Sequence, residues 1–309
     1  MKKLFVSMLA VAALVSCSKE QTVVMPEGEL IGFNSFVENA TRADKAADPS
    51  YNATTFTSFN VWGTVGGVAI YTGDVVTKGN DNIWKCAGNK QYWIDGASYE
   101  FAAVAGVDTQ KVVPGTDKLP STVTVDASTA NVDLLYAEKV VRTGGEGDNT
   151  VDFNFKHLLS KVKFTVKNNS TTADGYSFMV DEIKVKGAKT GTITLANKTW
   201  SNKGDADVYD VADITVAVGD ASEECASELL LIPGEFEVTY KVVIRCKGTD
   251  IATHTSTVNT VTLVGGNAYN LVIGVEVGDE ITFTAEQTDW DYDINDDNKV
   301  DANDNIQLQ

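Results

Sequence analysis

The C-terminal region contains the stretch whose residue types and spacing best suit metal chemistry. Between positions 293 and 304, side chains that carry oxygen fall at positions 1, 3, 5, 9 and 12 of a twelve-residue window. Calcium binds about six to eight oxygen atoms in a flexible loop, and such loops use this spacing. The predicted ligands are the side chains of Asp293, Asn295, Asp297, Asp301 and Asp304 and the main-chain carbonyl of Lys299. We therefore expect Ca²⁺ in this loop, in a structural role and not a catalytic one.

The loop also departs from the usual calcium-binding pattern. Asn298 stands at position 6, where glycine normally supplies a positive φ, and asparagine is the next most tolerant residue. The stretch resembles one half of a dockerin module, but a dockerin has two such loops with helices, and only five residues follow Asp304. We therefore do not expect docking to a cohesin. A solvated acidic tail over residues 291–309 is the alternative to a calcium site.

No recognisable catalytic constellation occurs elsewhere in the sequence. The two histidines, His157 and His254, have no nucleophile motif, metal-ligand spacing or paired carboxylates beside them. We interpret His157 as a structural residue between two domains, and we predict that the protein is not an enzyme. Tryptophans can stack on sugars, although they more often fill β-sandwich cores. The five candidates are Trp62, Trp84, Trp93, Trp200 and Trp290.

The N-terminal segment predicts export. Lys2 and Lys3 precede an apolar run of about a dozen residues, which is too short to span a bilayer and typical of a signal peptide. The run ends in LVSC, the pattern of a bacterial lipobox, so we predict a signal peptide over residues 1–17 with lipidation of Cys17. An ordinary secretory signal with a chance cysteine is the alternative. Residues 18–29 would form a flexible linker to a lipid anchor in the outer membrane.

Charge and cysteine content restrict the partners and the covalent structure. The formal net charge is −18, which argues against binding DNA or RNA, because nucleic-acid binding needs basic patches. Cys225 and Cys246 flank two strand-like runs that Pro233 and Gly234 would join as a hairpin. In that hairpin the two cysteines face each other, which predicts a disulfide in an exported protein. Two buried thiols that pack as small hydrophobes are the alternative.

Almost every segment beyond residue 29 has the pattern of a β-strand. Apolar and polar residues alternate, or β-branched residues cluster, between breaks rich in glycine, asparagine and aspartate. Short strands with regular turn signals predict β-sandwiches, and the chain length suggests two of them. We expect an all-β protein with sandwiches at residues 30–152 and 153–290, followed by the acidic tail at 291–309.

Several stretches together resemble the fimbrillin family of Bacteroidetes, the subunits of lipoprotein-derived surface pili. They are the lipobox, LIGFNSFVENATRADKA, QYWIDGASYEFAAVAG, NVDLLYAEKV, VDFNFKHLLSKVKFTV, LLLIPGEFEVTYKVVI and GGNAYNLVIGV. The resemblance implies two transthyretin-like sandwiches in tandem. It also implies that a trypsin-like protease cuts between Arg42 and Ala43 and that the first strand then leaves. A strand from another pilus subunit would fill the exposed groove.

In that mechanism, Ile31, Phe33 and Phe36 would be the residues with which the departing strand fills the core. A strand places alternate side chains on one face, so Phe33 is in phase with Ile31 and Phe36 is not. We therefore expect a bulge or bend near Asn34 and Ser35.

The position of this chain in a pilus is also predicted. Arg42 is the candidate cleavage site, with a plain exposed loop arginine as the alternative, and we interpret Arg142 as another loop arginine. Stalk subunits of the family donate an apolar C-terminal extension, which is missing beyond Trp290. We therefore predict a structural or adhesive pilus subunit at the tip or in an accessory position, with other pilus subunits as partners. The alternative is a surface lipoprotein that does not polymerise and binds a glycan or a host protein.

Overall fold

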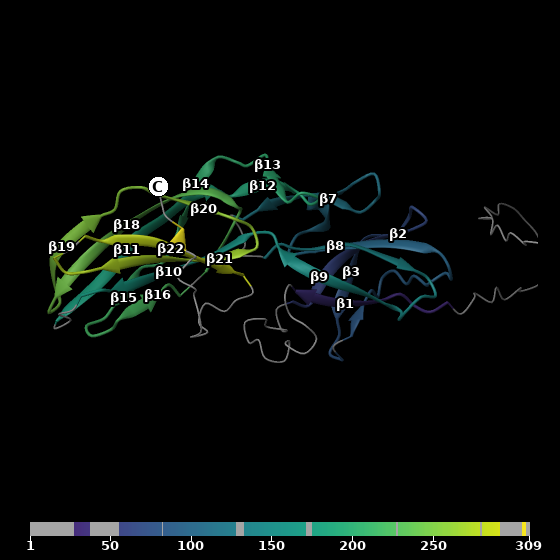
Figure 1. The fold of residues 1–309 in the computed structure, drawn as a ribbon, viewed down its shortest axis with the longest axis horizontal. Helices are drawn as coiled ribbons and strands as arrows, with labels where there is room; N and C mark the ends of the chain where they lie inside the picture. The colour runs from purple at the N-terminus through teal and green to yellow at the C-terminus, as the bar shows by residue number, and fades with distance from the viewer. Residues whose placement is uncertain are drawn as a thin grey trace, which may run out of the picture.

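The computed structural model is an all-β protein whose strands form two units placed end to end (Figure 1). It describes residues 28–37, 56–81, 83–127, 133–170, 175–226, 228–278, 280–290 and 305–306. Within these ranges the helical structure is limited to one 3-10 turn, η2 (Thr109–Lys111), which confirms the predicted all-β class. No helix in the described part of the chain is long and apolar enough to cross a membrane.

The first unit is a closed barrel of seven strands. Their order around the barrel is β1 (Gly32–Val37), β4 (Trp84–Lys85), β3 (Val68–Lys78), β2 (Ser58–Val65), β5 (Ser98–Ala105), β8 (Leu135–Thr143) and β9 (Thr150–His157). Neighbouring strands are antiparallel, except that β1 runs parallel to β9. Alternate residues of β9, namely Val151, Phe153 and Phe155, are fully buried, as expected for a small barrel filled by side chains.

The second unit consists of two sheets packed around a second core. One sheet has the order β16 (Ser222–Glu224), β10 (Ser160–Asn168), β21 (Asn267–Val275), β22 (Thr282–Asp289) and β23 (Asn305–Ile306), with β17 (Leu229–Leu231) also paired to β10. The other has the order β14 (Ala206–Asp210), β11 (Tyr176–Ala188), β18 (Gly234–Cys246) and β19 (Thr249–Thr255), with β15 (Ile214–Val216) on β11 and β20 (Asn259–Leu263) on β18. Inward residues of both sheets form one apolar cluster.

A third sheet joins the two units. Its order is β13 (Thr199–Ser201), β12 (Thr190–Thr194), β7 (Pro120–Asp126) and β6 (Val112–Pro114). Strands β6 and β7 lie between β5 and β8 in the sequence, whereas β12 and β13 follow β11 of the second unit. Ile193 of β12 pairs with Val123 of β7, and both are buried in a separate core together with Leu158 and Ile232. The two units are therefore connected by hydrogen bonds and a shared core as well as by the chain.

This arrangement differs from the predicted pair of sandwiches. The first unit is a barrel because β1 closes the sheet between β4 and β9, which is a long-range pairing that no local pattern specifies. The predicted boundary between residues 152 and 153 falls inside β9. The transthyretin-like character that the family resemblance implies stays a prediction.

The predicted hairpin of the two cysteines is wrong. Strand β17 pairs with β10, where Leu231 lies opposite Ser160, while β18 pairs with β11, β19 and β20. Cys225 follows β16 and lies beside β10 of one sheet, whereas Cys246 ends β18 of the other sheet, and the two are not bonded to each other. The physical reason is that the apolar run around β17 is buried on both faces, since Leu231 enters the second-unit core and Ile232 the junction core. The alternative is supported for Cys225, whose half-buried side chain packs against the second-unit core.

Candidate functional site

The candidate site is the place of β1 in the barrel, which we call the β1 site and define as β1 with its neighbours β4, β9 and residues 91–93. Strand β1 pairs with β9 over its full length, from Gly32 opposite Thr150 to Val37 opposite Phe155. On its other side it pairs with β4 at one position, Phe33 opposite Trp84. The barrel is therefore closed by a long parallel ladder on one side of β1 and a minimal contact on the other.

Residues just before β1 add hydrogen bonds at its N-terminal end. The Ile31 amide donates to the Gln91 carbonyl at 2.9 Å, and the Trp93 amide donates to the Glu29 carbonyl at 2.9 Å. The Gly32 amide donates to the Asn149 carbonyl at 2.8 Å. The beginning of β1 is thus held from both sides, whereas the pairing of its second half is with β9.

The inward face of β1 fills the centre of the barrel. Ile31 is 4% exposed and Phe33 is 2% exposed, which confirms that these two residues share the buried face. The Phe33 ring lies 5.6–6.4 Å from the rings of four core aromatics, stacked on Phe153 and edge-on to the others, which are Phe59, Tyr71 and Phe101. Truncation of such a residue in a core typically costs about 3–5 kcal/mol. Phe33 is therefore a major contribution of β1 to the stability of the barrel.

The bulge expected in β1 is not present. The register with β9 is unbroken from Gly32 to Val37, and this includes Asn34 and Ser35. Phe36 therefore follows the regular ladder, opposite Asn154. The bulge was expected from the spacing of the apolar residues alone, whereas the pairing of β1 with β9 continues without an extra residue.

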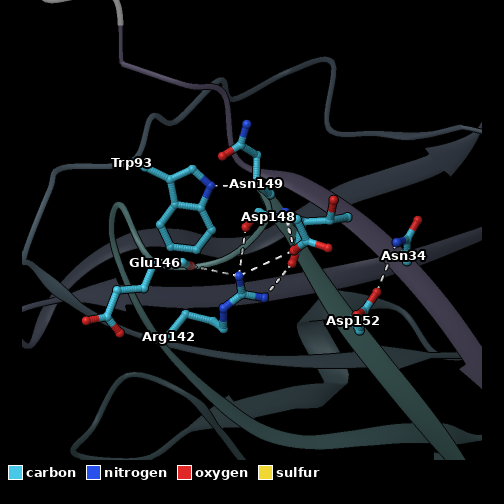
Figure 2. Close-up of polar contacts among 8 residues, drawn as sticks. Asn34, Trp93, Arg142, Glu146, Asp148, Asn149 and Asp152 are labelled. Atoms are coloured by element: carbon cyan, nitrogen blue, oxygen red, sulfur yellow. Dashed lines mark hydrogen bonds and ion pairs between the residues drawn. The ribbon is translucent and has the colours of Figure 1, made fainter.

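On the outward face, one polar contact links β1 to β9. The side-chain amide of Asn34 donates to a carboxylate oxygen of Asp152 at 2.9 Å, and the two residues are directly opposite in the ladder (Figure 2). Phe33 and Asn34 therefore mark the two faces of β1, one with a buried ring and one with a surface hydrogen bond.

Arg142 organises the connection that leads into β9. It lies near the end of β8, and its guanidinium donates to the carbonyls of Thr150 and Asp148 at 2.7 Å and of Glu146 at 3.3 Å (Figure 2). The Trp93 ring lies 5.8 Å from the guanidinium carbon. The interpretation of Arg142 as an exposed loop arginine was wrong, because its side chain is only 22% exposed and is engaged with this connection.

The Arg142 contacts position an acceptor for β1. The carbonyl of Asn149 lies within the connection that Arg142 holds, and it accepts from the Trp93 indole nitrogen at 3.1 Å (Figure 2). It also accepts from the Gly32 amide. Sequence reasoning missed this set because its acceptors are main-chain carbonyls, which every residue has. A lone arginine between strand residues and a glycine-rich turn was the available signal.

The other predicted site residues give no second site. Cys17, Arg42 and Ala43 lie outside the described residues, as does the predicted calcium loop with all its ligands: Asp293, Asn295, Asp297, Lys299, Asp301 and Asp304. The described residues contain no group of three or more histidine, cysteine, aspartate or glutamate side chains that could hold a metal ion.

The two histidines lie on strands of different units and have different environments. His157 ends β9, where its Nδ1 lies 2.6 Å from an Asp133 oxygen and its ring stacks on Trp290 with centroids 4.3 Å apart. His254 is exposed in β19, at the edge of a second-unit sheet. The location of His157 between the units agrees with the structural role that we predicted for it.

The tryptophans are mostly core residues. Trp62 is 2% exposed and Trp84 and Trp93 are each 7% exposed, so none of these three presents a face on which a sugar could stack. Trp200 and Trp290 are half-buried and pack against the junction core. A sugar-stacking role is therefore limited, among these residues, to the last two.

Comparisons with known proteins identify solved structures with a similar fold. The structure is similar to a fimbrial protein from Bacteroides vulgatus, with a TM-score of 0.60 at 17% identity, over 84% of this chain and 99% of the other. Two proteins assigned to cell adhesion, from Bacteroides ovatus and Bacteroides uniformis, give TM-scores of 0.53 and 0.50 at 16% and 18% identity. These matches cover 85% and 84% of this chain and 98% and 99% of the others. No curated protein matches the chain.

These similarities define a class, the two-unit all-β fold of fimbrial and adhesion proteins. The fimbrillin-like family matches residues 38–290, which begin directly after β1 and end at Trp290. The chain belongs to the fimbrillin-like family.

Proposed function

We propose that this protein is a structural subunit of a cell-surface pilus and that it assembles by strand exchange at the β1 site. The observation that carries the proposal is the geometry of β1, a strand close to the predicted cleavage position that closes the barrel and buries Phe33 in its core. Membership of the fimbrillin-like family and the similarity to fimbrial and adhesion proteins support a role at the cell surface.

The energetics of β1 supply a driving force for assembly. Removal of β1 would leave the hydrogen-bonding groups of β9 unpaired and would expose the aromatic pocket around Phe33 to water. An open sheet edge beside an exposed core is unfavourable in water, so the barrel would bind a replacement strand. A strand from a neighbouring subunit would restore both the hydrogen bonds and the core, which is β-augmentation.

Export and maturation would precede this exchange. The precursor would be lipidated at Cys17 and anchored in the outer membrane, and a trypsin-like protease would cut between Arg42 and Ala43. Because Arg42 is only a few residues beyond β1, this cut would free the strand from the barrel. The proposal also keeps the tip or accessory position, in line with the pairing of Asn305 and Ile306 to the chain's own β22.

The experiment that tests the proposal is cleavage followed by assembly. Residues 18–309 would be treated with a trypsin-like protease and run unboiled on SDS gels, alone and mixed with candidate stalk subunits. We expect a cut after Arg42 and then SDS-resistant assemblies, and assembly in the mixture alone would indicate the tip. The control is Arg42→Gln, which should stay uncut and monomeric. If cutting yields only a monomer that unfolds, β1 is a permanent strand and the proposal is wrong.

The second candidate is a surface lipoprotein that binds a glycan. A pocket of about 420 Å³ lies at the junction of the two units, and the half-buried Trp200 lines it together with Lys198 and Lys203. A tryptophan face with polar groups around it is the usual chemistry of sugar recognition. Glycan arrays with wild-type protein and Trp200→Ala, with and without Ca²⁺, would test this candidate. The calcium arm also tests the predicted loop at residues 293–304.

A further inference from the structure

The β1 site presents different chemistry at successive positions of the strand that it holds. We infer that the Phe33 pocket and Asp152 together select the incoming strand, which must run parallel to β9 and carry an aromatic residue followed directly by a hydrogen-bond donor. This inference rests on the proposed function, because it names the partner strand for the same site. Asp152 is thereby a specificity-determining residue for assembly.

The aromatic requirement follows from how tightly the pocket of Phe33 is built. The rings of Phe59, Tyr71, Phe101 and Phe153 surround the Phe33 ring, and each of these four residues is 1% exposed or less. The wall of the pocket formed by Phe101 is itself tightly packed, since a Cβ on Gly63 would lie 2.6 Å from the Phe101 ring. A smaller side chain in place of Phe33 would leave a cavity that these neighbours cannot fill by moving inward.

The polar requirement follows from Asp152. Its carboxylate lies on the outward row of β9 between Thr150 and Asn154, which are both uncharged, and it accepts from Asn34 of β1. An asparagine, lysine or arginine at this position of an incoming strand would donate to Asp152. An aspartate or glutamate there would place two negative charges opposite each other, which is unfavourable in a sheet.

The same contact fixes the register of the incoming strand. A shift by one residue would turn the aromatic residue outward, so the buried pocket already excludes it. A shift by two residues keeps the faces but would place Gly32, which has no side-chain donor, or Phe36 opposite Asp152. The same shift would place Ile31 or Ser35 in the Phe33 pocket, so Asp152 and the pocket favour the same register.

The position between the two apolar residues has room for one added methyl group and supplies an internal control. A Cβ on Gly32 would meet the Asn149 carbonyl at 3.4 Å and the Thr150 methyl at 3.6 Å, which are ordinary contacts. Alanine should fit there. The incoming strand should therefore carry an apolar residue, a small residue, an aromatic residue and a hydrogen-bond donor, in that order along the direction of β9.

Peptide exchange tests this reading. Residues 18–309 would be cut after Arg42, and a fluorescent peptide with the sequence of residues 28–39 would be added in increasing concentration. We expect the wild-type peptide to enter the barrel and a Phe33→Ala peptide to bind about 100-fold more weakly. An Asn34→Asp peptide should bind about fivefold more weakly, and a Gly32→Ala peptide should bind within twofold of wild type.

The protein variant Asp152→Asn provides the decisive comparison. It should remove the penalty of the Asn34→Asp peptide and any advantage of an Asn34→Lys peptide, whereas Glu100→Gln, an acid-to-amide change on β5 away from β1, should alter neither. If the wild-type peptide binds but all variants bind equally, the selectivity is wrong while strand exchange stands. If the wild-type peptide does not bind although β1 has left the barrel, both this inference and the proposed function are overturned.

Discussion

Single side chains in this protein hold main-chain segments that are distant in the sequence. Arg142 donates to two carbonyls of the β8–β9 connection and to the carbonyl of Thr150 at the start of β9, and that connection supplies the acceptor for the Gly32 amide at the start of β1. Arginine suits this role because its planar guanidinium carries several donors in a fixed geometry. The charge is only partly exposed, so its hydrogen bonds contribute more than those of a surface ion pair.

We predict that Arg142→Ala lowers the free energy of unfolding by about 2 kcal/mol, because two short charged hydrogen bonds are lost and their carbonyl acceptors lose a partner. It should also speed hydrogen exchange at the Gly32 amide. The control is Arg245→Ala, which removes an exposed contact to Asp250 and should cost about 0–1 kcal/mol. Urea unfolding and hydrogen-exchange mass spectrometry measure both effects, and equal values for the two variants would contradict the role of Arg142.

Buried tyrosines make the fold sensitive to alkali. Burial raises the pKa of Tyr240 from 10.0 to about 12, and its ring stacks on Phe283 in the second-unit core. Burial likewise raises the pKa values of Tyr71 and Tyr209. Because the unfolded chain ionises first, stability is fully present below about pH 10 and is lost as the pH rises towards 12.

We predict that Tyr240→Phe makes the fall of unfolding free energy between pH 10 and 12 shallower, by up to about 1.4 kcal/mol per pH unit. The remaining slope comes from the other buried tyrosines. Tyr92→Phe is the matched control, since Tyr92 is 48% exposed. Urea titrations at pH 8, 10 and 11 test this, and an unchanged slope in Tyr240→Phe would refute it.

At the scale of elements, strand irregularities shape the second unit. Strands β11 and β18 pair along most of their length, but the register shifts between Asp181 and Lys184. Glu182 lies in this bulge with φ of 52°, a left-handed conformation that is unfavourable for a residue with a side chain. Its side chain is 62% exposed and contacts Lys241, which also contacts Asp181. The bulge therefore stores strain with little compensating contact.

We predict that Glu182→Gly raises the free energy of unfolding by about 0.5–1 kcal/mol, because glycine adopts this φ without a steric cost. The lost surface contact to Lys241 should offset only part of the gain. Lys184→Gly, on the other side of the bulge in the same strand, should instead be destabilising by about the same amount. Denaturant unfolding of both variants measures the two free energies. A lower unfolding free energy in Glu182→Gly would mean that the bulge is not strained.

For the whole molecule, the shared sheet makes the two units interdependent. Strands β7 and β12 pair from Thr122 opposite Thr194 to Asp126 opposite Thr190, and the core beneath them contains residues from both units. Ile193 is 1% exposed in that core. The second unit therefore supports the barrel through β7. If β1 left the first unit, this support would remain.

We predict that Ile193→Ala lowers the free energy of unfolding by about 3 kcal/mol and separates the unfolding of the two units into two steps, because the cavity lies in the junction core. Thr192→Ala, on the other face of β12, should cost less than about 1 kcal/mol and keep a single step. Calorimetry resolves the steps. Identical single transitions in both variants would show that the junction does not couple the units.

The sequence by itself determined the features that depend on local pattern. Alternation and turn residues determined the all-β class, and the spacing of Ile31 and Phe33 determined that both point inward, because the side-chain period of a strand is two. The tertiary structure alone decided which strands are partners. Asn34 donates a hydrogen bond to Asp152, 118 residues away in the sequence. Strand β17 pairs with β10 and not with β18, and β7 pairs with β12 of the other unit. Backbone hydrogen bonds are the same for every residue, so only the packing of complete cores selects among these pairings.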